Sequence, residues 1–294
     1  MRVAAVASRR RAREYADEHG IERAYDSYEQ LLDDSGIDLV YNALPPAFHA
    51  RWTVAALEAG KHVLCEKPFT LNAAEAEEVV AAAARTGHRV IEAFHDHYHP
   101  LSAEVRSFLA AGGVGRVRTV RAVFDGSIPF DPSSIRHAPE VGGGALMDLG
   151  CYPVHWVRSL FGEPDVVRAV ARLNPLGADL SMDAELALPG GIAATVSANM
   201  TEGVALRSDL EVRGDDGVLL VQNVVFPSRG HSMTVERDGL PFTSTVAGRE
   251  TYDHQLDAVL AALASGEPLP TEGADSVGNM RAIDAIYAAA GLPR

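Results

Sequence analysis

Hydrophobic and polar positions follow two different patterns along the chain. Up to residue 93, short apolar runs alternate with longer stretches rich in Ala, Glu and Arg, most of which end at a glycine. The short runs are typical of buried parallel strands, and the stretches between them of crossover helices. Strands are expected at residues 2–8, 38–43, 62–65 and 89–93, and helices at residues 9–19, 28–33, 47–59 and 73–85.

The second pattern begins after Pro100 and is dominated by strands separated by glycine-containing turns. It predicts a large, mainly antiparallel sheet. Strands are expected at residues 116–125, 166–173, 180–188, 192–200, 208–213, 217–222 and 232–237, and helices at residues 101–111, 252–264 and 274–290. We therefore predict an α/β fold in which a parallel sheet (residues 1–97) is followed by an α+β domain (residues 98–294).

Composition narrows the class of protein. The chain has 294 residues, of which 47% are hydrophobic and 22% charged, as in a folded globular protein. Its formal net charge of −14 argues against a partner that is nucleic acid, which would require a basic surface. The pattern predicts neither a transmembrane helix nor a signal peptide, and Cys65 and Cys151 are too few for a disulfide framework. We expect a cytoplasmic protein with no membrane partner.

The first candidate for chemistry is a small, apolar run that follows three glycines, residues 142–144. Within it, Asp148 and Tyr152 are four residues apart, which is one helical turn. If the run is helical, the carboxylate can orient or tune the tyrosine hydroxyl for proton transfer, and the glycines allow backbone to approach a ligand closely. The alternative is a buried helix in which Asp148 caps a backbone group and Tyr152 packs.

A second candidate, Glu66-Lys67-Pro68, directly follows the strand expected at residues 62–65. A lysine between a buried strand and a proline is expected to point into a cleft at the C-terminal edge of the parallel sheet and not into solvent. A tyrosine with an ordinary pKa of about 10 is a poor base at neutral pH. A nearby Lys67 ammonium would favour the Tyr152 phenolate and so make it a better base.

Three motifs together resemble one known family. They are Glu66-Lys67-Pro68 after a strand, Asn42-Ala43-Leu44-Pro45-Pro46 followed by His49, and the glycine run before Asp148-Leu149-Gly150-Cys151-Tyr152. They resemble the Gfo/Idh/MocA family of NAD(P)-dependent oxidoreductases, which couples a Rossmann domain to a substrate domain with a large, mainly antiparallel sheet. Because Asp-x-x-x-Tyr replaces the Asp-x-x-x-His of inositol dehydrogenase, the chain is more similar to glucose–fructose oxidoreductase, dimeric dihydrodiol dehydrogenase and the xylose dehydrogenases.

The resemblance implies hydride transfer between NADP(H) and a hydroxyl or carbonyl group of a sugar or polyol. Tyr152 would be the general acid/base, with Lys67 beside nicotinamide and substrate, and Asp148 as the third catalytic residue. The implied cofactor contacts are Ser8, Arg9, Arg10, Leu44, Pro45, His49, Glu66 and Lys67. The implied substrate contacts are His95, His97, Tyr98, Arg136, Asp148 and Tyr152.

The resemblance leaves alternatives open. One is the oxidation of a trans-dihydrodiol, and another is a catalytically silent relative that binds a sugar or nucleotide. The retention of Lys67, Asp148 and Tyr152 together argues against a silent site. As in the family, we expect a homodimer or higher homo-oligomer that packs through the exposed face of the antiparallel sheet.

The run His95-Asp96-His97-Tyr98-His99 also invites a metal interpretation, because alternate histidines on an extended segment face the same way. The resembled family lines its nicotinamide and substrate pocket at this strand end, so we favour pocket lining and predict no metal site. Cys65 and Cys151 are expected to pack, because no His/Asp arrangement supports a thiol nucleophile.

The cofactor preference depends on Ser8-Arg9-Arg10, at the end of the first strand. An NAD-selective Rossmann domain usually has an acid there for the ribose hydroxyls, whereas a 2′-phosphate requires a cation. This chain has arginines and no acid, which favours NADP and leaves NAD possible. The alternative is that Arg9 and Arg10 merely begin a basic helix.

The Rossmann domain is expected to be truncated, because no strand with a G-x-G-x-x-G turn precedes Arg2. In the usual strand order the absent strand lies between the strands at residues 2–8 and 38–43. Its absence would leave these two strands unpaired on their inner edges or force them to close on each other. We therefore expect this form to bind NADP poorly, and a natural product longer by roughly 25 to 35 residues, about one strand, turn and helix.

Overall fold

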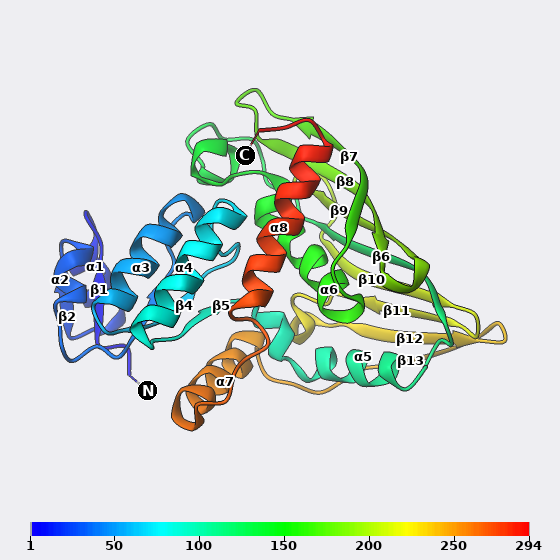
Figure 1. The fold of residues 1–294 in the computed structure, drawn as a ribbon, viewed down its shortest axis with the longest axis horizontal. Helices are drawn as coiled ribbons and strands as arrows, with labels where there is room; N and C mark the ends of the chain where they lie inside the picture. Colours follow the sequence, from blue (N-terminus) through cyan, green and yellow to red (C-terminus); the bar gives the residue numbers. More distant parts are fainter. Residues whose placement is uncertain (1, 294) are drawn as a thin grey trace.

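The computed structural model describes residues 2–293 and has two parts that lie side by side along its longest axis (Figure 1). A small part with parallel strands contains the N-terminal elements, drawn in blue and cyan. The second part is a large sheet with helices on one face. This arrangement confirms the predicted α/β fold with a large, mainly antiparallel sheet.

The parallel strands of the first part form two separate sheets. β1 (Ala5–Ala7) pairs with β2 (Arg23–Tyr25), whereas β3 (Leu39–Asn42), β4 (His62–Cys65) and β5 (Val90–Glu92) pair in that order. All of these pairings are parallel, as expected. In the described part of the chain β1 and β3 do not pair, so the two strands have not closed on each other.

Helices alternate with these strands in the sequence, because helix caps and the spacing of apolar residues both favour a helix at these positions. They are α1 (Ala12–His19), α2 (Tyr28–Leu32), α3 (His49–Glu58) and α4 (Ala73–Thr86). In α4, the Asn72 side chain accepts the backbone N–H of Glu75 at 3.0 Å, and Gly87 ends the helix in the left-handed conformation. The prediction missed β2, because its sequence Arg-Ala-Tyr is short and has no apolar alternation.

The second part is built on an eight-stranded sheet in which only the pair β6 and β9 is parallel. Its strands in spatial order are β13 (Leu240–Ser244), β12 (Ser232–Arg237), β11 (Val218–Gln222), β10 (Arg207–Gly214), β6 (Val117–Asp125), β9 (Ile192–Asn199), β8 (Asp179–Leu188) and β7 (Asp165–Leu173). The prediction missed β13, an exposed edge strand with a proline at its second position.

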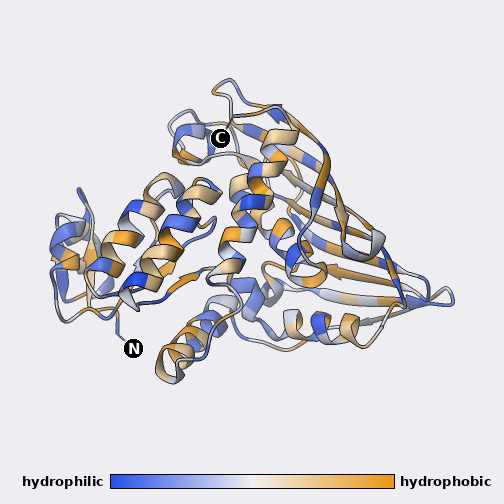
Figure 2. Ribbon diagram, in the orientation of Figure 1, coloured by the Kyte–Doolittle hydropathy of each residue, from blue (hydrophilic) through white to orange (hydrophobic). Residues whose placement is uncertain are grey.

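One face of this sheet is covered by α5 (Pro100–Ala110), α6 (Cys151–Phe161) and α8 (Ala274–Ala289), while α7 (Thr251–Ser265) lies below them in Figure 1. Apolar and polar residues alternate along the strands (Figure 2) because the apolar side chains point towards these helices. Among residues 2–293 no helix is long and apolar enough to cross a bilayer.

Contacts from the C-terminal helices join the two parts. On α8, Asp284 accepts the backbone N–H of Ala73, at the start of α4, at 2.8 Å. Just before α8, Glu272 forms a half-buried ion pair with Arg89 at 2.8 Å. Asp284 thus ties the start of α4 to α8, α8 also packs against α6, and the candidate site lies at this junction.

Candidate active site

Lys67 lies just beyond the C-terminal end of β4, where the sequence predicted a cleft residue. Its side chain is only 14% exposed, and its Nζ donates to the backbone oxygen of Asp148 at 2.7 Å and lies 3.3 Å from Asp148 Oδ1. The same ammonium lies over the Tyr152 ring, 5.1 Å from the ring centre. Burial alone would lower the pKa of Lys67, but Asp148, Cys151 and Glu66 together outweigh burial and raise it.

Asp148 is held by two cations and not by the tyrosine. Its Oδ1 faces Lys67, and its Oδ2 accepts a 2.8 Å hydrogen bond from Nε of Arg136. Burial would raise the pKa of Asp148, but Lys67 and Arg136 together keep it below its usual value. Asp148 lies in the π-helical turn Leu146–Gly150, and both of its carboxylate oxygens face cations, so it makes no hydrogen bond to Tyr152.

The glycine run before this turn serves the protein's own packing. Gly144 has φ of 125°, and a Cβ there would lie 2.1 Å from Asp179 Oδ1. Asp179 in turn accepts the backbone N–H of Leu146 at 2.7 Å and the hydroxyl of Tyr287 at 2.8 Å. Gly144 therefore leaves room for Asp179, which fixes the start of the π-helical turn.

Tyr152 is 4% exposed and its hydroxyl lies 3.1 Å from Nε2 of His95. The His95 ring stacks on Tyr252 of α7, with 4.2 Å between ring centres. Burial raises the pKa of Tyr152 well above its ordinary value, so the hydroxyl is a neutral phenol in this state.

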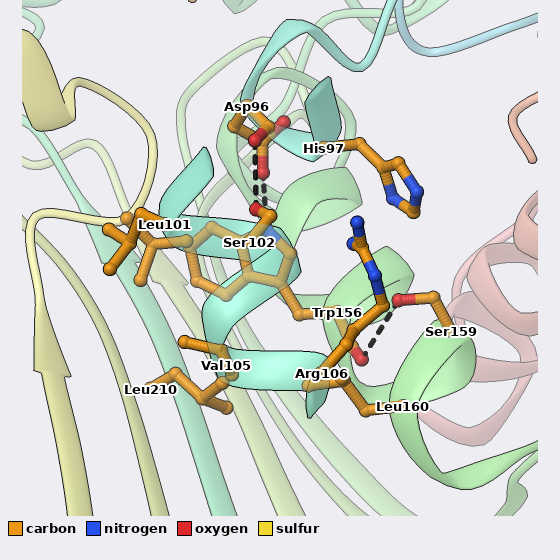
Figure 3. Close-up of a pocket in the computed structure, with 11 residues that line it drawn as sticks. Asp96, His97, Leu101, Ser102, Val105, Arg106, Trp156, Ser159, Leu160 and Leu210 are labelled. Carbon is orange, nitrogen blue, oxygen red and sulfur yellow. Dashed lines mark hydrogen bonds between the residues drawn. The ribbon is translucent and has the colours of Figure 1, made fainter. Parts of the chain in front are cut away.

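The remaining members of the histidine run point elsewhere. Residues His95–Tyr98 form a 3₁₀ turn, so successive side chains diverge, and the extended segment of the metal interpretation is not present. The Tyr98 hydroxyl bonds Thr271 at 2.7 Å, and His97 lines a separate cavity with Arg106 and Trp156 (Figure 3). His97 and Tyr98 therefore do not join the cluster around Tyr152.

Several predicted cofactor residues form the scaffold behind Lys67. His49 is buried and its two ring nitrogens lie 2.5 Å from the carbonyl oxygen of Leu44 and 3.0 Å from that of Pro68. It ties the half-buried Leu44–Pro45 segment to the Glu66-Lys67-Pro68 turn. Glu66 accepts the Tyr41 hydroxyl and, at 3.1 Å, the backbone N–H of Lys67. His49 is thus a positioning residue within the protein.

Ser8, Arg9 and Arg10 follow the C-terminal end of β1, as expected. The Ser8 hydroxyl accepts the backbone N–H of Arg11 at 3.2 Å, which starts the turn into α1. Arg9 and Arg10 are exposed, and neither forms an ion pair with a residue between positions 2 and 293. The structure thus presents two uncompensated guanidinium groups at this strand end.

Two further features bear on the chemistry. Cys65 and Cys151 are buried free thiols whose pKa values burial raises, which agrees with packing. Within the described residues no group of three or more His, Cys, Asp or Glu side chains is arranged to hold a metal ion. The site therefore offers a buried phenol, an ammonium and a carboxylate, which suits acid/base chemistry at a substrate oxygen.

Tyr252 is the member of this cluster that the sequence did not reveal. Tyr252 lies in the first turn of α7. Its ring stacks on that of His95, which is distant in the sequence. No local pattern distinguishes it from other half-exposed aromatic residues, so only the tertiary fold identifies it.

Comparison with known proteins agrees with this fold. Residues 1–94 match the oxidoreductase family with an NAD-binding Rossmann fold, and residues 102–220 match the GFO/IDH/MocA C-terminal domain. The D-xylose 1-dehydrogenase (NADP(+)) 2 of Haloferax volcanii is 37% identical over 293 residues, 98% of this chain and 89% of that protein. The trans-1,2-dihydrobenzene-1,2-diol dehydrogenase of Homo sapiens is 35% identical over 225 residues, 75% of this chain and 66% of that protein.

Among solved structures, a 3-ketoreductase from Actinomadura kijaniata in complex with NADP and TDP-benzene is similar with a TM-score of 0.89. It is 30% identical, and the match covers 97% of this chain and 89% of that chain. The fold and the comparisons define a nicotinamide-dependent oxidoreductase built from a Rossmann part and a large sheet. The chain belongs to the Gfo/Idh/MocA family of oxidoreductases.

Proposed function

We propose that this protein transfers hydride between NADP(H) and a hydroxyl or carbonyl group of a sugar or polyol, with Tyr152 as general acid/base. The observation that carries the proposal is the buried Tyr152 phenol below the Lys67 ammonium, at the C-terminal edge of the parallel sheet. Relatives named for xylose and dihydrodiol oxidation support a substrate with vicinal hydroxyls.

The donor set at the end of β1 fits NADP. The guanidinium groups of Arg9 and Arg10 have no acidic partner among the described residues, and a 2′-phosphate would supply one. When bound, the cofactor supplies the hydride donor or acceptor. Arg9 and Arg10 would hold its 2′-phosphate, and Lys67 would lie near the reacting oxygen.

The residues of the site would have different roles in the proton transfer. In the reducing direction the neutral Tyr152 phenol would donate its proton to the oxygen that becomes the alcohol, and in the oxidising direction the Tyr152 phenolate would accept that proton. The Lys67 ammonium stabilises negative charge that develops on either oxygen. Asp148 pairs with Lys67 and favours its charged form, and Arg136 in turn holds Asp148.

A direct assay tests the proposed reaction. Purified protein is incubated with NADP+ or NAD+ and a panel of aldoses, polyols, a trans-dihydrodiol and a nucleotide-linked sugar, and the reduced cofactor is followed by absorbance. In a form that binds the cofactor, we expect NADP-dependent oxidation of at least one sugar or polyol. Turnover of the dihydrodiol alone would favour the diol dehydrogenase, and cofactor binding without turnover of any substrate would favour the silent relative.

Replacing Arg9 by aspartate is expected to move the cofactor preference from NADP towards NAD. The change removes a partner of the 2′-phosphate and supplies an acceptor for the ribose hydroxyls. Titration of both cofactors into wild-type and Arg9→Asp protein measures the change. The control is Arg13→Asp, which alters charge by the same amount further along α1. Equal affinities in wild type and Arg9→Asp would show that Arg9 does not contact the cofactor.

The outer face of the large sheet is the proposed dimer surface. Val167 and Val170 on β7 are 64% and 57% exposed, and this face also carries Arg121, Arg168, Asp183 and Glu185 around a hollow. Charges of both signs next to apolar residues make the surface self-complementary for a two-fold contact. We expect light scattering to give a dimer for wild type and a monomer for Val170→Asp, whereas a monomeric wild type would refute this surface.

A further inference from the structure

Residues 245–250 connect the edge strand β13 to α7 without forming helix or strand (Figure 1). The backbone of this segment is held by histidine side chains. The N–H of Val246 donates to Nε2 of His231 at 2.9 Å, and the N–H of Arg249 donates to Nε2 of His254 at 3.1 Å. Within residues 2–293 these are the hydrogen bonds that the backbone N–H groups of the segment donate. Two imidazoles therefore fix its path.

A third histidine packs against the same segment. His99 is 1% exposed, and its Nδ1 accepts the backbone N–H of Leu101 at 3.1 Å, which caps the start of α5. Its Nε2 faces Gly248, where a Cβ would lie only 2.1 Å away, so the segment passes directly over the ring. The centre of the His99 ring lies 5.3 Å from that of His254 and 6.1 Å from that of His231. The three rings thus form one cluster.

These contacts require neutral imidazoles. A ring nitrogen accepts a hydrogen bond through its lone pair, and a protonated imidazole has no free lone pair because both of its nitrogens carry a proton. The partners of His231 also fix its tautomer: Nδ1 donates to the carbonyl oxygen of Pro227 at 2.9 Å, which leaves Nε2 as the acceptor. Protonation of His231 or His254 would therefore place an N–H against an N–H of the segment and break that hydrogen bond.

The surroundings oppose protonation of the buried member of the cluster. Burial, followed by the charges of His254 and His231, lowers the pKa of His99 to about 4, and Glu250 acts in the opposite direction. The stability that neutral His99 contributes is complete above its ordinary pKa of about 6.5 and is lost as the pH falls from there towards 4. The other charged side chains nearby in the sequence are Arg229, Arg249, Asp253 and Asp257, of which Arg249 and Asp257 pair with each other.

The segment leads directly to the candidate active site. The residue after it, Thr251, is buried at the start of α7, and the next, Tyr252, stacks on the His95 ring. Nε2 of His95 lies 3.1 Å from the Tyr152 hydroxyl. The path of residues 245–250 therefore determines where the Tyr252 ring lies relative to this hydroxyl.

We propose that His99, His231 and His254 form an acid-sensitive latch: neutral, they hold residues 245–250 and Tyr252 in place, and their protonation releases this segment. His231 and His254 are half-buried, so protons reach them from solvent without a route through the core. Once either of their hydrogen bonds breaks, His99 loses the cover of the segment and is protonated in turn. The effect of the latch on catalysis rests on the proposed function, whereas the release of the segment does not.

Amide hydrogen exchange measures the latch directly and needs no cofactor. For each histidine that is neutral in the closed state and free in the open state, opening becomes about tenfold or more easier between about pH 7 and pH 5. We expect the protection factors of the Val246 and Arg249 amides to fall by at least this factor. The control amide is that of Leu176, which donates to the non-titrating side-chain oxygen of Asn174 at 2.8 Å and keeps its protection. Unchanged protection of Val246 and Arg249 at about pH 5 would overturn the latch.

A double variant separates titration from structure. In His231→Gln/His254→Gln the side-chain amide oxygens can accept the same backbone N–H groups but do not titrate. We expect wild-type protection of the segment at neutral pH and a smaller loss than in wild type on acidification; an equal loss would count against the latch. The matched control is His88→Gln, because the His88 ring donates to the carbonyl oxygen of Thr86 at 3.0 Å and does not need to be neutral for that bond. If the double variant does not fold, the wild-type exchange alone decides the proposal.

Turnover then tests the effect on the active site, in a form that binds the cofactor. On acidification we expect kcat/KM of wild type to fall about tenfold further than that of His231→Gln/His254→Gln, because the loss in the variant reflects the chemical step alone. Release of the segment with equal acid profiles of turnover would refute its action on the site. If no substrate is turned over at any pH, the proposed function fails, while the exchange measurements still decide whether the latch exists.

Discussion

Replacing Tyr152 by phenylalanine is expected to lower turnover by about 10² to 10⁴-fold, the usual contribution of a general acid/base. The substitution deletes only the ionisable oxygen and leaves the ring below Lys67, so the cation and ring still pack. Arg9 and Arg10 are at a different strand end, so cofactor affinity should remain that of wild type. The measurements are steady-state kinetics with the best substrate and titration of NADP.

Tyr25→Phe is the matched control for this variant. It also removes one tyrosine hydroxyl that is hydrogen-bonded to a side chain, here to Asp34 at 2.9 Å, but it lies on β2, away from Lys67. We expect Tyr25→Phe to retain turnover. Wild-type turnover of Tyr152→Phe would reject the acid/base role, and equal losses in both variants would mean that the effect is structural.

The fold was largely predictable because most elements carry their own signals. Glycines such as Gly20 and Gly87 end helices in the left-handed conformation, and apolar residues alternate along β8 and β9. The elements that escaped prediction, β2 and β13, are short strands whose side chains are exposed or half-buried. Their pairing depends on a neighbouring strand and not on a local pattern.

The candidate site was predictable only in part. Lys67 and Tyr152 could be identified from two motifs, and the fold brings them together as expected. The partners of Asp148 could not be predicted, because four-residue spacing assumes a regular α-helix and Leu146–Gly150 is a π-helical turn. The His95–Tyr252 stack likewise depends on how α7 packs, which no local sequence pattern encodes.

Arg136, Asp148 and Lys67 interact in series. Each of these charged groups affects the protonation state of its neighbour. Arg136 and Lys67 keep Asp148 ionised, and Asp148 favours the charged form of Lys67 although burial opposes it. Because the pKa of Asp148 is lowered on folding, the stability it contributes is present above its ordinary pKa and is lost as pH falls through the folded value. At neutral pH Asp148 is ionised and Lys67 is protonated, so the Lys67 ammonium is available to the reaction.

Lys67→Met should therefore lower turnover about as much as loss of a general acid/base, by about 10² to 10⁴-fold, and also move the pH profile. Removal of the cation beside Tyr152 disfavours its phenolate further, so the pKa of Tyr152 rises and oxidation requires a more alkaline solution. We expect the rising limb of kcat/KM against pH, measured for alcohol oxidation, to shift to higher pH. An unchanged rising limb would show that Lys67 does not influence the ionisation of Tyr152.

The structure provides a matched control for this variant in Lys61. It is another buried lysine, and its Nζ donates to the backbone oxygen of Asp34 at 2.7 Å, as Lys67 does to that of Asp148 at 2.7 Å. Lys61 precedes β4, and among the described residues its ammonium does not lie over a tyrosine ring. Loss of either lysine removes a buried hydrogen bond to a charged group, which costs about 1.5 to 3 kcal/mol of unfolding free energy. We expect Lys61→Met to lower thermal stability and to keep both turnover and pH profile, so a loss of turnover in Lys67→Met alone reports on the reaction and not on the fold.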